Sequence, residues 1–118
     1  MKNKQRGTLG ENAVAEYLQR EGYRILARNY RYQRAEIDLI AKKGNQISFV
    51  EVKTRSSNRF GTPAEAVTPA KRANIIRGAQ GYLAEFSPQG CTYSFDVAEV
   101  LMMNGQAEIH YIQNAFTL

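Results

Sequence analysis

The fold is decided by two neighbouring stretches of sequence, Glu36-Ile37-Asp38-Leu39-Ile40-Ala41 and Gln46-Ile47-Ser48-Phe49-Val50-Glu51-Val52-Lys53. Both look like strands, and the second is rich in the β-branched and aromatic side chains that strands favour. The residues between them, Lys42-Lys43-Gly44-Asn45, have the composition of a turn. The sequence therefore predicts a β-hairpin over residues 36–53.

The segment before the hairpin has the pattern of a helix followed by a strand. Thr8 is a suitable N-cap, and Glu11 stands three residues later, which is the spacing of a capping box. Apolar residues then recur at helical spacing until Gly22, which suits a helix end. We expect a helix over residues 9–21 and a short strand over residues 23–30.

The segment after the hairpin begins with a polar loop and continues as a second helix. Thr68 and Pro69 suit the N-cap and the first helical position, which predicts a helix over residues 69–86. Two strands should follow, over residues 92–102 and 107–112, because an Asn-Gly dipeptide between them is typical of a tight hairpin turn.

The expected order of elements is therefore α-β-β-β-α-β-β, an α/β fold. Helices flanking a mixed central sheet would bury both of its faces. Gly78 and Gly81 are unfavourable inside a helix, but small residues there would allow close packing on the sheet.

Length and composition indicate one domain that spans residues 1–118, with a loose basic tail at residues 1–7. The basic N-terminus is followed by no apolar segment of a secretory signal, and no apolar run approaches the roughly 20 residues that cross a bilayer. We expect a cytoplasmic protein without a membrane partner.

The charge balance favours a polyanionic partner. The chain carries 16 basic and 11 acidic side chains, a net charge of +5. Lys and Arg contacts to phosphates release counterions, so such a surface suits nucleic acid. A single cysteine, Cys91, and a single histidine, His110, exclude an internal disulfide and a Cys-rich zinc site.

The hairpin carries the residues with the clearest chemistry. Residues i and i+2 of a strand share a face, so Glu51 points the same way as Lys53, and Glu36 the same way as Asp38. Pairing about the turn sets Asp38 opposite either Val50 or Glu51. In the second register two carboxylates meet on one face; the sequence alone leaves both registers open.

Two adjacent carboxylates repel each other, and a divalent cation relieves that repulsion. Mg²⁺ suits such a site, with Mn²⁺ as a substitute, because it binds one or two carboxylates and keeps several waters. Lys53 could orient an attacking water, act as its base or stabilise the developing charge. The alternative is a solvated strand face, but Ile47 and Phe49 share that face with Glu51 and predict that it is partly buried.

Several further residues are candidates for supporting roles. Glu11 is either part of the capping box or a further acidic group of the site. Glu36 could lie behind the site or be a solvated residue at a strand end. Asp96 could close the far side of the site or be a structural hydrogen-bond acceptor. Gln80 could face the site from the second helix. The basic residues that could line a phosphate path are Arg55, Arg59, Lys71, Arg72 and Arg77.

The chain also resembles a known family. The resemblance rests on these segments, which occur in the family's order: Gly10-Glu11 with Ala15, Asn29-Tyr30-Arg31, Glu36-Ile37-Asp38-Leu39-Ile40, Phe49-Val50-Glu51-Val52-Lys53-Thr54-Arg55, Phe95-Asp96-Val97 and Asn114-Ala115-Phe116. They are similar to the YraN family of bacterial proteins. That family has a restriction-endonuclease-like fold and is distantly similar to archaeal Holliday-junction resolvases.

The resemblance implies a PD-(D/E)xK active site that depends on a divalent metal. Asp38, Glu51 and Lys53 match its core residues, Glu11 matches an acidic residue of the first helix in resolvase-like members, and the backbone carbonyl of Val52 is a candidate third metal ligand. The chain departs from the family at two positions. Ala35 stands where glycine is usual, and Ser94 where a basic residue is usual.

These observations favour a metal-dependent endonuclease that hydrolyses phosphodiester bonds in DNA. The resemblance to resolvases implies branched or structured DNA as the substrate, and a homodimer is a further hypothesis because two symmetric cuts need two sites. Two alternatives stay open at this point. One is a nucleic-acid-binding module that does not cleave, and the other is an interaction subunit of a larger DNA-processing complex.

Overall fold

The computed structural model describes residues 3–55 and 67–117. Two helices and five strands follow one another in the expected order: α1 (Asn3–Arg20), β1 (Arg24–Tyr32), β2 (Ala35–Lys43), β3 (Gln46–Arg55), α2 (Pro69–Phe86), β4 (Thr92–Met103) and β5 (Gln106–Phe116).

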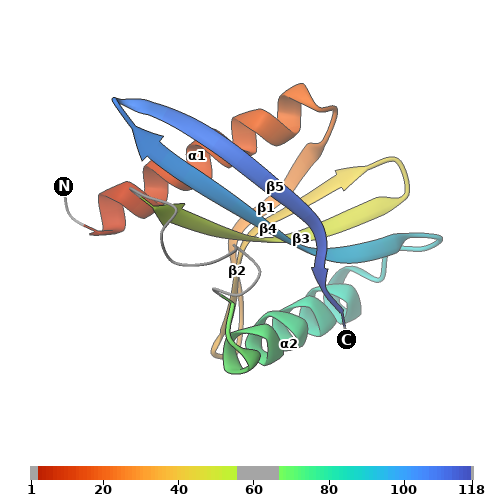
Figure 1. Ribbon diagram of the computed structural model, residues 1–118. Coiled ribbons are helices and arrows are strands. Elements are labelled where there is room, and N and C mark those ends of the chain that lie inside the picture. Colours follow the sequence, from red (N-terminus) through yellow and green to blue (C-terminus); the bar gives the residue numbers. More distant parts are fainter. Residues whose placement is uncertain (1–2, 56–66, 118) are drawn as a thin grey trace.

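The five strands form one mixed sheet in which spatial order equals chain order, β1-β2-β3-β4-β5. Strands β3 and β4 are parallel, and the other neighbouring pairs are antiparallel. Helix α2 connects the parallel pair, since parallel strands need a crossover. The two helices lie against opposite faces of the sheet (Figure 1), which confirms the α/β prediction.

Each helix buries one apolar stripe against one face of the sheet. On α2 the buried residues include Ile75, Ala79 and Tyr82, which pack in a cluster with Phe49 and Phe95. On α1 the corresponding residues are Val14, Ala15 and Leu18, which pack with Leu39, Val50 and Ala98. Alternate residues of β3 thus enter the two clusters, as the pleat of a strand requires.

Helix α1 begins earlier than the sequence pattern predicts. It starts at Asn3, so residues 3–7 are helical, and the expected loose tail and the N-cap at Thr8 are both wrong. Lys, Gln and Arg in this segment are good helix formers, and they extend the helix past a residue type that often caps one. Glu11 consequently lies within the helix and not in a capping box.

Helix α2 follows the prediction at both ends. The Thr68 hydroxyl accepts a hydrogen bond from the Lys71 backbone N–H at 3.2 Å, and Pro69 occupies the first turn. The helix ends at Ser87, whose backbone is left-handed. Gly78 approaches Ile37 and Gly81 approaches the Tyr32 ring, which confirms that these small residues allow close packing on the sheet.

A third close approach joins α1 to β3. A Cβ atom at Gly10 would meet the Thr54 hydroxyl, so the absence of a side chain at this position lets the helix lie against the strand. This contact lies one residue from Glu11, and it sets how near the helix brings that carboxylate to the sheet.

We expect Gly10→Ala to destabilise the protein by about 1–3 kcal/mol because the new methyl group overpacks the helix–strand contact. Elsewhere in a helix the same change stabilises by about 1 kcal/mol. Urea denaturation of the single variant and of Gly10→Ala combined with Thr54→Ala tests this. The second change removes the colliding hydroxyl, so the loss should largely disappear; a loss of equal size in both backgrounds would contradict the close-packing explanation.

Candidate active site

The site is built where β2 and β3 separate. The two strands pair from Lys43↔Gln46 to Leu39↔Val50, and this register, continued by one residue, sets Asp38 opposite Glu51. The ladder stops there. The Val52 backbone N–H donates a hydrogen bond to the Asp38 carboxylate at 2.8 Å, where a paired strand would supply a backbone acceptor. A side chain of β2 thus occupies the place of the missing ladder bond.

A local irregularity in β1 and β2 turns Asp38 into this position. Ile37 and Leu39 are two residues apart, yet they pack in the clusters on opposite faces of the sheet. On the neighbouring strand, Asn29 stands across from Asp38, between two paired residues, and has a left-handed backbone with φ 52°. Asn tolerates that conformation better than most residues, so Asn29 provides the twist at which the regular side-chain alternation of β2 breaks.

Asp38 and Glu51 form a strongly interacting carboxyl pair. Glu51 is only 4% exposed. Burial raises the pKa of Glu51 to about 7, and the negative charge of Asp38 adds to that shift. Burial also raises the pKa of Asp38, although its hydrogen bond from Val52 lowers it in part. One proton or one cation would relieve the repulsion between the two groups.

Two lysines lie near this pair. The Lys71 ammonium, from the first turn of α2, is 3.4 Å from Glu51 Oε1. Lys53 follows Glu51 by two positions on β3, and its positive charge lowers the pKa of Glu51. Ile47 and Phe49, earlier on the same strand, are fully buried, which confirms that this face is not a solvated one.

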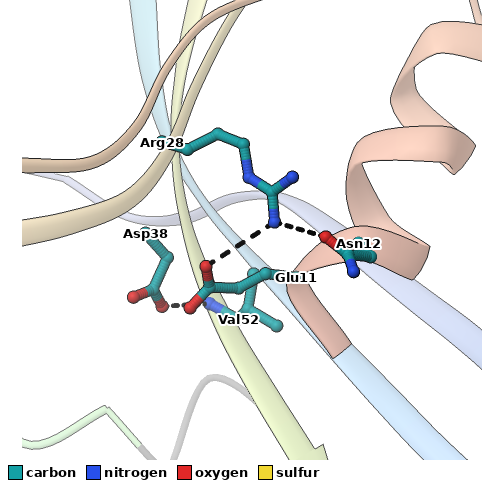
Figure 2. Close-up of polar contacts among 5 residues, drawn as sticks. All are labelled: Glu11, Asn12, Arg28, Asp38 and Val52. Atoms are coloured by element: carbon teal, nitrogen blue, oxygen red, sulfur yellow. Dashed lines mark hydrogen bonds and ion pairs between the residues drawn. The ribbon is translucent and has the colours of Figure 1, made fainter. Parts of the chain in front are cut away.

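Glu11 approaches the pair from α1. Its carboxylate lies between the Arg28 guanidinium and the Asp38 carboxylate (Figure 2), with Arg28 Nη2 at 4.0 Å from Glu11 Oε1. Arg28 also donates a 2.6 Å hydrogen bond to Asn12. Burial and the charge of Asp38 raise the pKa of Glu11, whereas a hydrogen bond with Asn29 and the charge of Arg28 oppose that shift. Three elements thus bring acidic side chains together.

The remaining acidic candidates, Glu36 and Asp96, lie in different surroundings. Glu36 lies close enough to raise the pKa of both Asp38 and Glu11, and it pairs with Arg31 at 3.2 Å. Asp96 is fully buried in β4, where it accepts hydrogen bonds from the Tyr111 hydroxyl and the Asn114 N–H. Those bonds hold the irregular end of β5, so the structure gives Asp96 a structural contact.

Gln80 is exposed on α2, whereas the side chains that face the sheet from this helix are Ile75, Ala79 and Tyr82. The structure does not place Gln80 in that buried face.

The structure places four of the five basic candidates, and it places them in different surroundings. Arg55 makes a 3.2 Å ion pair with Glu99, and both side chains are largely buried. Arg72 donates to the Val67 carbonyl at 2.9 Å and lies over the Phe116 ring. Lys71 contacts Glu51, Arg77 is exposed on α2, and Arg59 lies outside the described residues.

Sequence reasoning missed four features of this region. They are the contact of Lys71 with Glu51, the buried carboxylate of Glu99, the Arg28 contact with Glu11, and the left-handed turn at Asn29. Of these, only Asn29 had a local signal, because asparagine is enriched at such positions. The other three join residues on different elements.

The donor atoms at the site suit a hard divalent cation. A strand residue directs its N–H and C=O toward the same neighbour, so the Val52 carbonyl faces the side on which β2 has separated. Within residues 3–55 and 67–117, no three Asp, Glu, His or Cys side chains converge closely enough to hold a metal ion. Asp38, Glu51 and the Val52 carbonyl are the donors that could hold such an ion together with water, a mixture that Mg²⁺ commonly accepts.

Comparison with solved structures identifies the fold. The structure of Archaeoglobus fulgidus Hjc, a Holliday junction resolvase from an archaeal hyperthermophile, matches with a TM-score of 0.54 and 13% sequence identity. The match covers 87% of this chain and 72% of that chain. The fold is therefore α/β and restriction-endonuclease-like.

Sequence comparison then identifies the family. The family described as "Uncharacterised protein family UPF0102" matches residues 10–100 of this chain. The chain belongs to this family, which is the YraN family. A UPF0102 protein of Syntrophomonas wolfei is 45% identical, with 97% of this chain and 99% of that protein aligned. One of Chlorobium chlorochromatii is 56% identical over 80% of this chain and 72% of its own length.

Neither helix in the described part of the chain is long and apolar enough to cross a membrane.

The raised pKa of Glu51 predicts how stability depends on pH without metal. Its pKa is about 7 in the folded protein and 4.5 ordinarily, so the folded state binds more protons between these values. The free energy of unfolding should then fall by roughly 1–3 kcal/mol as pH rises from 4.5 to 7. Urea denaturation in EDTA at several pH values measures this fall.

The matched variants are Glu51→Gln, which cannot titrate, and Glu16→Gln on the exposed side of α1. The first should flatten the dependence and the second should leave it unchanged. A dependence of the same slope in wild type and Glu51→Gln would show that another group causes it.

Proposed function

We propose that this protein is a metal-dependent endonuclease that hydrolyses phosphodiester bonds in DNA. The observation that carries the proposal is the buried Asp38–Glu51 pair at the point where β2 and β3 separate, with Lys53 two residues farther along β3. The restriction-endonuclease-like fold supports it, since the related fold of Hjc belongs to a Holliday junction resolvase.

Asp38, Glu51 and the Val52 carbonyl would hold the cation, Mg²⁺ or Mn²⁺. When bound, such an ion lowers the pKa of a coordinated water and neutralises charge on a phosphate oxygen. The Val52 N–H fixes one oxygen of Asp38 and so orients the carboxylate. Burial of Glu51 excludes water from that ligand and strengthens its electrostatic interactions.

Lys53 would act at the reacting phosphate. Its side chain is partly buried on the strand that carries Glu51. An ammonium group there donates hydrogen bonds to an attacking water or to the phosphate oxygens, on which negative charge develops. Glu11, whose carboxylate lies by Asp38 and is oriented by Arg28 and Asn29, would accept a hydrogen bond from a water of the site.

The substrate we propose is branched DNA, and the support comes from the resolvase whose fold this chain shares. The net charge of +5 suits any polyanion. Among the predicted phosphate contacts, Arg77 on the exposed side of α2 and Arg59 would act through charge, whereas Arg55 and Arg72 have partners within the protein.

Cleavage of labelled DNA tests the proposal. Linear, flap, fork and four-way-junction DNA would be incubated with the purified protein in Mg²⁺, Mn²⁺ or EDTA. We expect cleavage that needs the metal and prefers a branched substrate. Asp38→Asn and Lys53→Met should each lower the rate by about 100-fold or more, since each removes a group that acts in the transition state.

The control is Glu16→Gln, which removes an exposed carboxylate from α1 and should cleave at the wild-type rate. Tight DNA binding without cleavage in either metal would contradict the nuclease proposal and favour a binding module. Cleavage that survives in both site variants would identify a contaminating nuclease.

Cleavage of a four-way junction at two symmetric positions needs two active sites, and one chain supplies one. We therefore expect a homodimer, at least on junction DNA. Size-exclusion chromatography with light scattering, with and without junction DNA, gives the mass of each species. A single protein chain per junction at saturating protein would contradict the dimer.

A further inference from the structure

Lys71 occupies an unusual position for a surface lysine. It is the third residue of α2, and its backbone N–H is held by the Thr68 cap at 3.2 Å. Its side chain is 46% exposed, yet its ammonium ends 3.4 Å from Glu51 Oε1, whose side chain is 5% exposed. A half-exposed cation thus reaches an almost completely buried carboxylate.

The placement of this charge is unfavourable for the helix itself. A positive charge in the first turn opposes the helix dipole and so destabilises this end of the helix. The compensating contact is on the sheet, where the positive charge of Lys71 lowers the pKa of both Asp38 and Glu51. The charge of Lys71 therefore finds its favourable interaction with the carboxylate pair and not with the helix that carries it.

This contact uses a carboxylate oxygen for which a metal at the same pair would compete. A Mg²⁺ ion binds carboxylate oxygens at about 2.0–2.1 Å. An ammonium that stayed at 3.4 Å from Glu51 Oε1 would then lie within a few ångströms of a dication. Two positive charges repel each other strongly over such a distance, and this repulsion favours departure of the ammonium when the metal arrives.

The flexible side chain of Lys71 allows the ammonium to be replaced by a metal with little change elsewhere. A lysine side chain has four flexible methylene groups and a strongly hydrated head. Because it is already half exposed, it can withdraw from Glu51 into solvent without movement of α2.

We propose that Lys71 is a tethered counter-cation that occupies the carboxylate pair in the metal-free protein and is displaced when a divalent cation binds. The inference rests on the proposed function only in requiring a cation at Asp38 and Glu51. It assigns to Lys71 a competition with the metal, which lowers the metal affinity of the site.

The test measures Mn²⁺ affinity of the full chain without DNA, from the loss of the electron paramagnetic resonance signal of free Mn²⁺. Lys71→Met keeps most of the stem and removes the charge, and it should bind Mn²⁺ more tightly by about threefold or more. Lys71→Arg keeps the charge and should stay near the wild-type affinity. Arg20→Met removes a charge from the exposed last residue of α1 and should change affinity by less than about twofold.

A second measurement uses the wild-type protein alone, so it does not depend on a variant that folds. Lysine acetylation followed by mass spectrometry reports how free each ammonium is. The reactivity of Lys71 should rise when Mg²⁺ is added, and that of Lys43, at the hairpin turn, should not change.

The outcomes separate the two proposals. Mn²⁺ binding that Glu51→Gln abolishes but Lys71→Met leaves unchanged would overturn the role of Lys71 and keep the metal site. No Mn²⁺ binding in either wild type or Lys71→Met would overturn both. Unchanged Lys71 reactivity at saturating Mg²⁺ would likewise overturn the displacement.

Discussion

The mutual repulsion of Asp38 and Glu51 is the constraint on which the arrangement of this site depends. Burial raises the pKa of both groups, and the negative charge of Asp38 raises the pKa of Glu51 further, whereas a hydrogen bond with Glu51 lowers the pKa of Asp38. The surrounding structure compensates in two ways. The Val52 N–H donates to Asp38, and the Lys71 ammonium contacts Glu51. A group of this kind is maintained at the expense of stability, which is expected of a functional site.

The same constraint explains features of the fold that lie around the pair. Strands β2 and β3 stop pairing after Leu39 and Val50, because the backbone of Val52 binds a carboxylate instead of a strand. The left-handed backbone of Asn29 stands across from Asp38. The bare backbone of Gly10 lets α1 approach β3, and with it Glu11. The left-handed backbone at Asn29, the glycine at position 10 and the end of the β2–β3 ladder therefore all lie around the carboxyl pair.

Much of the fold could be predicted because its signals are local. The hairpin turns at Gly44 and at Asn104-Gly105 have positive φ values, as their residue types predict. Thr68 and Pro69 begin α2, and the chain order of elements is the predicted one. The start of α1 was not predictable from its capping pattern, because a cap signal competes with the helix propensity of the residues before it. The pairing of Asp38 with Glu51 followed from the turn, but only as one of two registers.

The sequence by itself thus determined the order of the elements and which residues share the hairpin, because turns, caps and strand alternation are set by neighbours along the chain. Only the tertiary structure decided what those residues contact. Lys71 meets Glu51 because α2 packs on the sheet, and Arg55 meets Glu99 because β4 pairs with β3, whereas Asp96 accepts a hydrogen bond from Tyr111. The physical reason is that a charge has no preferred partner along the sequence; it pairs with whichever opposite charge or hydrogen-bonding group the packed elements bring within reach.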